Sequence, residues 1–390
     1  MAKKPYKRTV LACFGSFVSQ AIIVNFAPLL FLTFQSTYSI PLEEITVLVM
    51  VNFVTQIAVD IIASKYVNKI GYRICFVTAH IMCGIGLIAI AFLPELINPF
   101  VGLIIPTIIY ASGSGLIEVM ANPVLEACPI ENKSRIMSIM HSFYCWGVVR
   151  VILLSTLFFT VIGIENWKIL SCLWAVIPLA NAVFITTVPI YPIAEETNDK
   201  ANYRELFSQK PFCLIILIMI GAGAAEMSVA QWASTFAETG FGLSKTMGDI
   251  VGVCGFATYM GLARVMYGKY SEKISLKTAI SISAVLCIIG YVLIGISTVS
   301  SIGLFGCMLC GFSVGIFWPG TISLASERVK SGGTTMFALC ALGGDLGCSA
   351  GPALAGFMTG VLGDNLRLGI LCAVVFPLLI LAGTTMLKNK

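Results

Sequence analysis

Charge is what this sequence has least of. Asp, Glu, Lys and Arg make up only 11% of its 390 residues, whereas a soluble domain carries roughly 25%. Hydrophobic residues account for 58%, and the mean hydropathy is +0.94. So few charges cannot give a folded domain the polar surface that water requires. The composition therefore excludes a soluble globular protein and favours an integral membrane protein.

Sequence signatures of enzymes are also missing. The chain has no phosphate-binding loop for ATP, no paired metal-ligand motif and no nucleophile–base set in a loop domain. Its 14 cysteines are scattered, and Cys307 and Cys310 form one close pair without a flanking His. We therefore expect no enzyme and no bound metal or organic cofactor. The net charge of +5 does not indicate nucleic acid, because the basic residues lie at the edges of apolar segments.

Apolar runs of about 20 residues recur along the chain, and each is long enough to cross a hydrocarbon core of about 30 Å as a helix. They are too long and too evenly apolar for the strands of a barrel. The sequence predicts an all-α membrane protein with twelve transmembrane helices, at residues 9–34, 42–64, 74–95, 99–125, 135–161, 168–190, 211–236, 247–269, 277–298, 301–326, 333–360 and 366–387.

The basic residues predict the orientation of the chain. Of its 24 Lys and Arg residues, 19 lie on the side of the N-terminus, and Arg150 and Arg264 lie within spans. The loops on the opposite side hold only Lys168, Lys245 and Arg367. Because Lys and Arg accumulate on the cytoplasmic side, we expect both termini to be cytoplasmic. The short termini and compact loops favour a bacterial inner membrane.

An internal repeat divides the chain into two halves. Residues 64–73 match residues 268–277 at an offset of 204 positions, and the longest polar segment lies between the sixth and seventh spans. We predict an N-terminal six-helix bundle at 1–190, a cytoplasmic linker at 191–210 and a pseudo-symmetric C-terminal six-helix bundle at 211–390. Related halves of this kind place a substrate site near the middle of the membrane.

One carboxyl group lies deep in the fourth span. Glu118 is about 12 Å from the inner end, at about 1.5 Å of rise per residue. A charge there costs on the order of 3 kcal/mol, so such residues usually face a cavity and handle substrate or protons. Asn122 follows one turn later, and Pro123 removes a backbone donor. An acid, an amide and a helix break in six residues predict a binding site within the membrane.

The repeated loop resembles that of the major facilitator superfamily, whose pattern is Gly-x-x-x-Asp-Arg/Lys-x-Gly-x-Arg/Lys. The second copy fits at Gly268, Glu272, Lys273 and Lys277. The first copy departs from the pattern at Ser64 and Asn68, and fits at Lys69, Gly71 and Arg73. In this family the loop acid helps to latch the two halves. The resemblance implies a conformational latch to which we assign Asp60, Lys69, Arg73, Arg264, Glu272 and Lys273.

Within the superfamily, the chain is similar to the fucose permease-like sugar/proton symporters. Three segments carry this resemblance, namely Glu118-Val-Met-Ala-Asn122-Pro123, Ala225-Glu226 followed by Trp232, and Ile316-Phe-Trp-Pro319. The family also carries a carboxylate in its first helix, where this chain offers only Gln20 and Asn25. The resemblance implies two six-helix bundles that rock around a central sugar site, with proton coupling at Glu118.

Two more buried acids, Glu226 and Asp345, lie about 22 and 18 Å deep by the same count. Arg150, about 22 Å deep, is too costly to bury alone, so we expect it to pair with one of them. We take Glu118, Glu226 and Asp345 as proton-coupling candidates. The predicted substrate-binding residues are Gln20, Asn25, Glu118, Asn122, Trp146, Arg150, Glu226, Trp232, Trp318 and Asp345.

The chemistry of this set favours a sugar. Amides can both donate to and accept from hydroxyl groups, and indole rings offer flat apolar faces. For Asn25 and Asn122 a helix–helix hydrogen bond is an equal alternative, and for Trp232 so is anchoring at the interface. Asp345 stays open between substrate contact and ion pairing.

We therefore expect a monomeric secondary transporter in the lipid bilayer that moves a small hydroxylated solute, such as a monosaccharide, by alternating access with a proton as coupling ion. Three alternatives stay open: a facilitator without proton coupling, a proton-coupled exporter of amphipathic drugs, and a membrane receptor or scaffold on a transporter fold. The missing first-helix acid favours the facilitator.

Overall fold

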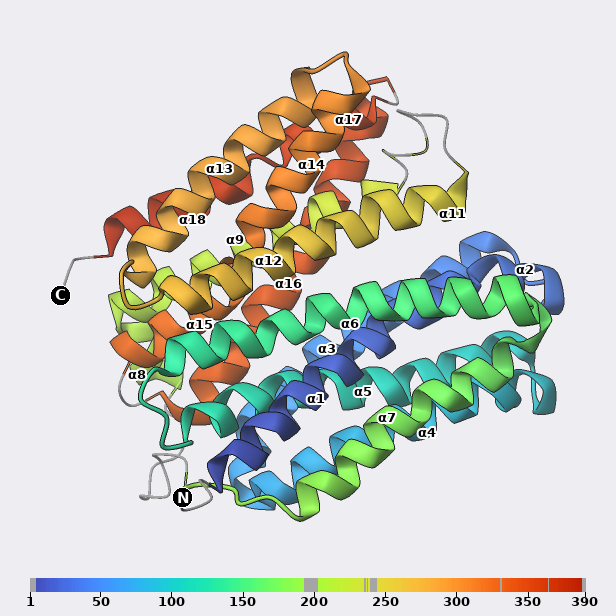
Figure 1. Cartoon of the computed structure of the whole chain (residues 1–390), viewed down its shortest axis with the longest axis horizontal. Coiled ribbons are helices and arrows are strands. Elements are labelled where there is room, and N and C mark those ends of the chain that lie inside the picture. Colours follow the sequence, from blue (N-terminus) through green and yellow to red (C-terminus); the bar gives the residue numbers. More distant parts are fainter. Residues whose placement is uncertain are drawn as a thin grey trace. The chain divides into compact units, whose positions relative to one another are not determined.

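The computed structural model describes residues 5–192, 203–234, 236, 238, 244–329, 332–363 and 365–387. Within these ranges the regular elements are all helical (Figure 1). Twelve helical segments are long and apolar enough to cross a membrane, from Tyr6–Tyr38 to Leu366–Met386. The prediction of an all-α chain with twelve spans is confirmed.

The contacts divide the chain into two compact units, residues 1–130 with 147–198 and residues 131–146 with 199–390. We call them the first and second unit. The first unit contains α1 (Tyr6–Phe26), η1 (Ala27–Leu30), α2 (Phe31–Tyr38), α3 (Leu42–Ile70), α4 (Tyr72–Leu96), α5 (Pro99–Glu126), the second half of α6 (Lys133–Ile162), η2 (Ile164–Asn166) and α7 (Trp167–Thr186). The first half of α6 is assigned to the second unit.

The second unit contains α8 (Tyr203–Ser208), α9 (Lys210–Ala230), α11 (Lys245–Gly248), the π-helical turn η3 (Asp249–Cys254), α12 (Gly255–Tyr270), α13 (Leu276–Ile296), α14 (Ser300–Val314), α15 (Phe317–Arg328), α16 (Gly333–Val361), α17 (Leu366–Cys372) and α18 (Val375–Met386). Residues 193–202 of the predicted linker lie outside the described residues. The bundle boundaries at 190 and 211 stay a prediction.

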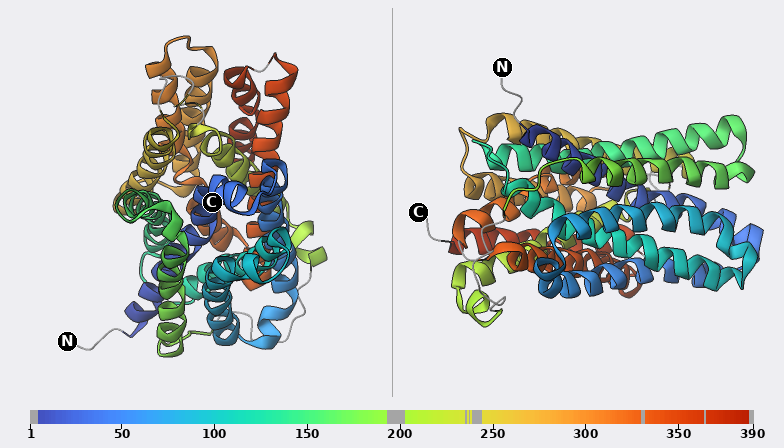
Figure 2. Two further views of the ribbon diagram at one scale, coloured as in Figure 1. Left: turned by 90° about the vertical axis from the view of Figure 1, so that its right-hand side faces the viewer. Right: turned by 90° about the horizontal axis from the view of Figure 1, so that it is seen from below.

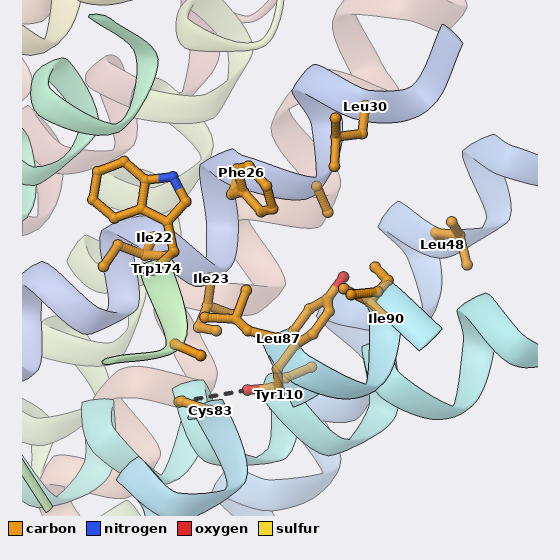
Figure 3. Packing of buried hydrophobic residues seen from close by; sticks show 14 of the residues in the cluster. Ile22, Ile23, Phe26, Leu30, Leu48, Cys83, Leu87, Ile90, Tyr110 and Trp174 are labelled. Atoms are coloured by element: carbon orange, nitrogen blue, oxygen red, sulfur yellow. Dashed lines mark hydrogen bonds between the residues drawn. The ribbon is translucent and has the colours of Figure 1, made fainter. Parts of the chain in front are cut away.

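An apolar core holds the first unit together. Ile22, Ile23 and Phe26 of α1 belong to one buried cluster with Leu87 of α4 and Tyr110 of α5 (Figure 3). The helices α4 and α5 lie side by side (Figure 2). This packing buries the apolar faces of α1, α4 and α5 against one another, and so fixes the helices that carry Gln20 and Glu118.

A neutral polar cluster ties α1, α4 and α7 together inside this core. The amide nitrogen of Asn181 donates to the carbonyl oxygen of Ala12 at 3.0 Å and lies 2.9 Å from Nε2 of His80. The other ring nitrogen of His80 lies 2.8 Å from the carbonyl oxygen of Phe76. Each polar group has a partner, as burial requires. His80 is therefore a structural residue of the packed core.

The two copies of the repeated loop have the same structural function. Arg73 donates three hydrogen bonds, at 2.8 to 2.9 Å, to the carbonyl oxygens of Ile185, Thr186 and Val188 at the end of α7. Lys277, which is 204 positions later, donates to the carbonyl oxygen of Leu387 at the end of α18. The last carbonyls of a helix lack internal partners, and basic side chains satisfy them. Each half thus caps its own final helix with the basic residue that closes the repeated motif.

Gly71 gives the first copy its sharp turn. Its φ of +99° lies in the left-handed region, which a side chain strains. The equivalent Ser275 has φ of −64° and caps α13, because its hydroxyl oxygen accepts from the backbone N–H of Thr278 at 3.2 Å. The two turns between helices are therefore built differently, although the basic residue after each keeps its function.

In the second unit, α9 packs closely on α16, and α13 lies beside α18 (Figure 1). The approach of α9 to α16 depends on glycine. A Cβ atom added at Gly347 would overlap the carbonyl oxygen of Ile220, and one at Gly223 would overlap that of Gly344. Small residues allow helix backbones to approach in this way, so α9 and α16 form a tight pair that carries Glu226 and Asp345.

Gly347→Ala should weaken this pair, because a methyl group would be forced against backbone that cannot rotate away. Overpacking of this kind costs about 1–3 kcal/mol, so the midpoint of thermal unfolding in detergent should fall by several degrees. Gly360→Ala in the same helix is the control, since a Cβ atom there meets nothing within 4 Å. Equal midpoints for the two variants would contradict the close-packing argument.

Candidate functional site

The fourth-span acid meets the first helix. Glu118 of α5 is buried, with 7% of its surface exposed. Its Oε2 accepts a hydrogen bond of 2.7 Å from Nε2 of Gln20 of α1. This length is typical of bonds to a charged acceptor. The amide of the first helix therefore binds directly to the acid of the fourth span.

The two predicted asparagines bind to their own helices. Nδ2 of Asn122 donates to the carbonyl oxygen of Glu118 at 3.0 Å, and Nδ2 of Asn25 donates to that of Ala21 at 2.9 Å. In both cases the bond runs back one turn. Asn122 thus lies one turn from Glu118 on a shared face of α5, whereas Asn25 lies beyond Gln20 on α1.

A second acid lies in an ionic cluster of the second unit. Glu226 of α9 is 8% exposed, and its Oε2 lies 3.7 Å from Nη2 of Arg264 of α12. Arg264 is only 2% exposed. Its Nη1 donates to the carbonyl oxygen of His141 at 2.7 Å and to Sγ of Cys145 at 3.0 Å, both on α6. The carboxylate of Glu226, the guanidinium of Arg264 and its two acceptors on α6 therefore form one buried polar cluster.

Pro319 explains how Arg264 is anchored. Proline has no backbone N–H, so the carbonyl oxygen of Gly315 loses the donor that would close its turn. The helix breaks there, between α14 and α15. Nε of Arg264 donates to this carbonyl oxygen at 2.9 Å. The proline of the aromatic–proline segment thus leaves free the carbonyl oxygen that accepts from a buried arginine.

Asp345 lies in different surroundings. It is 4% exposed on α16, and its Oδ2 has no hydrogen-bond partner among the described residues. The preceding residue, Gly344, faces the indole of Trp318 so closely that a Cβ atom would overlap the ring. Within the same ranges, Nε1 of Trp232 and Oγ1 of Thr321 are also buried without a partner. These atoms are a carboxylate acceptor, an N–H donor and a hydroxyl.

Trp146 packs on a glycine rather than on another polar residue. A Cβ atom at Gly261 of α12 would lie 3.2 Å from the Trp146 ring. Trp146 therefore lies in the second unit, directly after Cys145 and five residues after His141, the two residues of α6 to which Arg264 donates.

The prediction that Arg150 is buried is wrong, because its side chain is exposed. Leu153, Leu154 and Leu157 are exposed as well. Residues at these spacings share one face of a helix, so Arg150 belongs to an exposed face of α6. Glu226, which we expected to pair with it, has Arg264 as its ion-pair partner.

The predicted latch residues are spread over several contacts. Oε1 of Glu272 accepts from Nδ2 of Asn132 at 3.3 Å, Lys69 lies over the ring of Tyr66, and Lys273 is exposed. Asp60 is buried in α3. Arg264 belongs to the Glu226 cluster. The latch role of this set stays a prediction.

Sequence reasoning missed a polar stripe on α3. Asn52 and Gln56 are buried, and Oδ1 of Asn52 and Nε2 of Gln56 lack partners among the described residues. Asp60 and Ser64 continue the same four-residue spacing. That period places all four on one helix face, and it was the signal that could have found them.

Comparisons with known proteins agree with this architecture. The sequence profile described as Major Facilitator Superfamily matches residues 12–352. No curated protein matches the chain. The structure of FucP, the fucose:proton symporter of E. coli, in the outward conformation has a TM-score of 0.79 at 14% identity and covers 98% of this chain and 99% of its own. The proton:xylose symporter XylE, solved with 6-bromo-6-deoxy-D-glucose, has a TM-score of 0.79 at 12% identity, covering 97% and 95%.

Gln20→Ala should destabilise the protein by about 1–3 kcal/mol, the usual cost of leaving a buried acceptor unsatisfied. The loss should shrink in a Glu118→Ala background, because the two side chains then no longer depend on each other. Thermal unfolding of the four proteins measures this coupling. Asn25→Ala is the control for the same helix. An equal loss in both backgrounds would show that the Gln20–Glu118 bond contributes nothing.

The profile match covers most of the chain, and the fold agrees over nearly its whole length. The chain belongs to the major facilitator superfamily and is an integral membrane protein with a transporter fold.

Proposed function

We propose that this protein moves a small hydroxylated solute, of the monosaccharide class, across the membrane together with a proton that Glu118 binds and releases. The observation that carries the proposal is the bond of 2.7 Å between Gln20 and Glu118 inside the membrane-spanning helices. It supplies a carboxyl group with a partner that can serve both of its protonation states.

An amide can adapt to a change of proton. When Glu118 is ionised, Nε2 of Gln20 donates to it. When Glu118 is protonated, its O–H can donate to the carbonyl oxygen of the same amide after the amide rotates. An Arg or Lys at position 20 would hold the acid ionised instead. Gln20 can therefore stay hydrogen-bonded to this buried carboxyl group whether the group is ionised or protonated.

The second unit by itself holds groups suited to a sugar. Oδ2 of Asp345 can accept from a hydroxyl, Nε1 of Trp232 can donate to one, and Oγ1 of Thr321 can do either. The indole of Trp318 lies one residue from Asp345 across the α15–α16 contact. Apolar ring faces next to hydrogen-bonding groups match the alternation of C–H faces and hydroxyls on a monosaccharide.

The solved structures support the same class. FucP and XylE are described as a fucose:proton and a proton:xylose symporter, and both share the fold of this chain over almost all of its length. Their low identity to the chain, 14% and 12%, leaves the solute to be found by experiment.

One observation favours a facilitator as the second candidate. The resemblance implies an acid in the first helix, and the comparable region of this chain, residues 20–28, offers only the amides of Gln20 and Asn25. A facilitator would use the Gln20–Glu118 bond only to bind solute, and would move it without moving protons.

Proteoliposomes that report internal pH separate the candidates. They would be given fucose, xylose and glucose in turn. Internal acidification that depends on one of the sugars supports symport, and entry of that sugar without acidification supports the facilitator. Failure of every sugar to enter would contradict the proposed solute class.

Glu118→Gln should abolish proton-driven accumulation and leave exchange of preloaded sugar largely intact, because an amide binds hydroxyls but carries no titrating proton. One pH unit corresponds to about 1.4 kcal/mol, enough for about tenfold accumulation with one proton. The variant should bring that ratio to one. Glu131→Gln, at an exposed position, is the matched control. Equal loss of accumulation and exchange would instead make Glu118 a structural residue.

A further inference from the structure

We propose that Arg264 is a positioning residue that links the protonation of Glu226 to the hold of α12 on the first half of α6. The inference rests on the proposed proton-coupled transport and assigns it a second proton-sensitive group in the second unit. The sequence placed Arg264 with the loop latch, and its contacts point elsewhere.

Arg264 connects three helical elements besides its own. Nε donates to the carbonyl oxygen of Gly315, and Nη1 donates to the carbonyl oxygen of His141 and to Sγ of Cys145. Nη2 lies 3.7 Å from Oε2 of Glu226. Every nitrogen of the guanidinium is thus used, and the group is almost fully buried.

Only one of these contacts carries a negative charge. The acceptors on Gly315, His141 and Cys145 are two backbone carbonyls and a thiol, which are neutral. Arginine stays protonated in proteins, so the cluster is neutral overall only while Glu226 is ionised. A buried charge that loses its counter-ion is strongly destabilising. Protonation of Glu226 therefore removes the negative charge that stabilises the guanidinium of Arg264 in this position.

The other ionisable groups around Glu226 do not replace it. The ionisable groups on the helices that pack on α9 are Tyr203, Arg204 and Glu205 (α8), Cys307 and Cys310 (α14), Glu327 and Arg328 (α15), and Cys340, Asp345 and Cys348 (α16), and α18 has none. Those on the helices that contact the cluster include His141 and Cys145 (α6), Arg264 (α12) and Tyr291 (α13). The hydroxyl of Tyr291 donates to the carbonyl oxygen of Ala225 at 2.8 Å, next to Glu226. Within the described residues, the ion pair of Arg264 is with Glu226.

The hold on α6 depends on the position of Arg264. Besides the two bonds from Nη1, Oγ of Ser138 donates to the backbone carbonyl oxygen of Arg264 at 2.7 Å. Close packing at Gly261 and Gly268 brings α12 against α6. If the guanidinium turns away after Glu226 is protonated, its two donors leave His141 and Cys145. A proton on α9 is then converted into a looser contact between α12 and α6.

Because α6 is one continuous helix, a change in the contacts of its first half can reach its second half. Its first half, to Trp146, is assigned to the second unit, and its second half, from Gly147, to the first. A change in the hold on the first half is carried along the helix itself. Arg264 thereby joins a proton-binding group to the helix that the two units divide between them.

Cys145 is a natural reporter of this contact. Its thiol is buried 3.0 Å from Nη1 of Arg264, whereas Cys213 on α9 is exposed. The full-length protein would be treated with N-ethylmaleimide, and labelling of each cysteine would be measured by peptide mass spectrometry. The ratio of Cys145 to Cys213 labelling corrects for the effect of pH on thiol reactivity.

Glu226→Gln should raise this ratio by at least about threefold, because local opening of the contact exposes Cys145 more often. Arg264→Gln should raise it as well, and adding Glu226→Gln to that variant should change it no further. In the native protein the ratio should rise as pH falls, and Glu226→Gln should abolish that rise. Asp345→Asn, which removes another buried acid of the same unit, should leave the ratio unchanged.

A native ratio in Glu226→Gln, or the same increase with and without Arg264, would overturn the proposal. Where Arg264→Gln does not fold, Arg264→Lys takes its place, since it keeps the charge and loses the planar fork. The assay needs neither solute nor gradient. Failure of every sugar in the uptake assay would therefore leave this result standing, and native labelling alongside intact coupled uptake would overturn this inference alone.

Discussion

A carboxyl group among apolar helices has to be hydrogen-bonded, ion-paired or protonated, and this constraint shapes the interior of both units. Each of three acids meets it differently. Glu118 has an amide partner in Gln20, Glu226 faces the guanidinium of Arg264, and Oδ2 of Asp345 has no hydrogen-bond partner in the part of the chain that is described. The cost of an unsatisfied group in a low-dielectric interior is high, so these different surroundings give the three acids different tasks.

The polar cluster in the core of the first unit is different, because its groups are neutral and hydrogen-bonded. Asn181, His80 and the carbonyl oxygen of Ala12 join three helices of the first unit without any charge, so their arrangement does not depend on a proton. Glycine at positions such as 347 lets α9 and α16 pack backbone against backbone. Glu226 and Asp345 are thus held on closely packed helices, so a change of protonation acts first on the contacts of their side chains.

Much of the fold could be predicted from the sequence. Hydrophobic length alone gave twelve spans, and the repeated loop pointed to two related halves. Glu118 could be singled out because a carboxyl group is rare in an apolar run. The pairing of Arg264 with Glu226 could not, since counting depth by residue treats helices as upright and ignores tilt and the length of an arginine side chain. The prediction that Arg150 is buried was wrong for a related reason, because depth does not say which face of a helix a residue occupies.

The roles of short polar motifs could not be predicted from the sequence either. Asn25 and Asn122 fit a substrate site by spacing, but a local bond to the previous turn competes for the same amide. Arg73 fits a latch by its motif, and in the structure it caps α7. In each case the tertiary neighbours decide which of several possible partners a polar side chain binds.

The central claim is that the carboxyl group of Glu118 changes its protonation when solute binds. Infrared difference spectroscopy of the full-length protein measures this directly, through the C=O stretch of a protonated carboxyl group on addition of each sugar of the uptake panel. We expect the transported sugar to change that band in the native protein and not in Glu118→Gln. A native protein that binds the sugar without a change in the band, or a variant with the same change, would contradict the account.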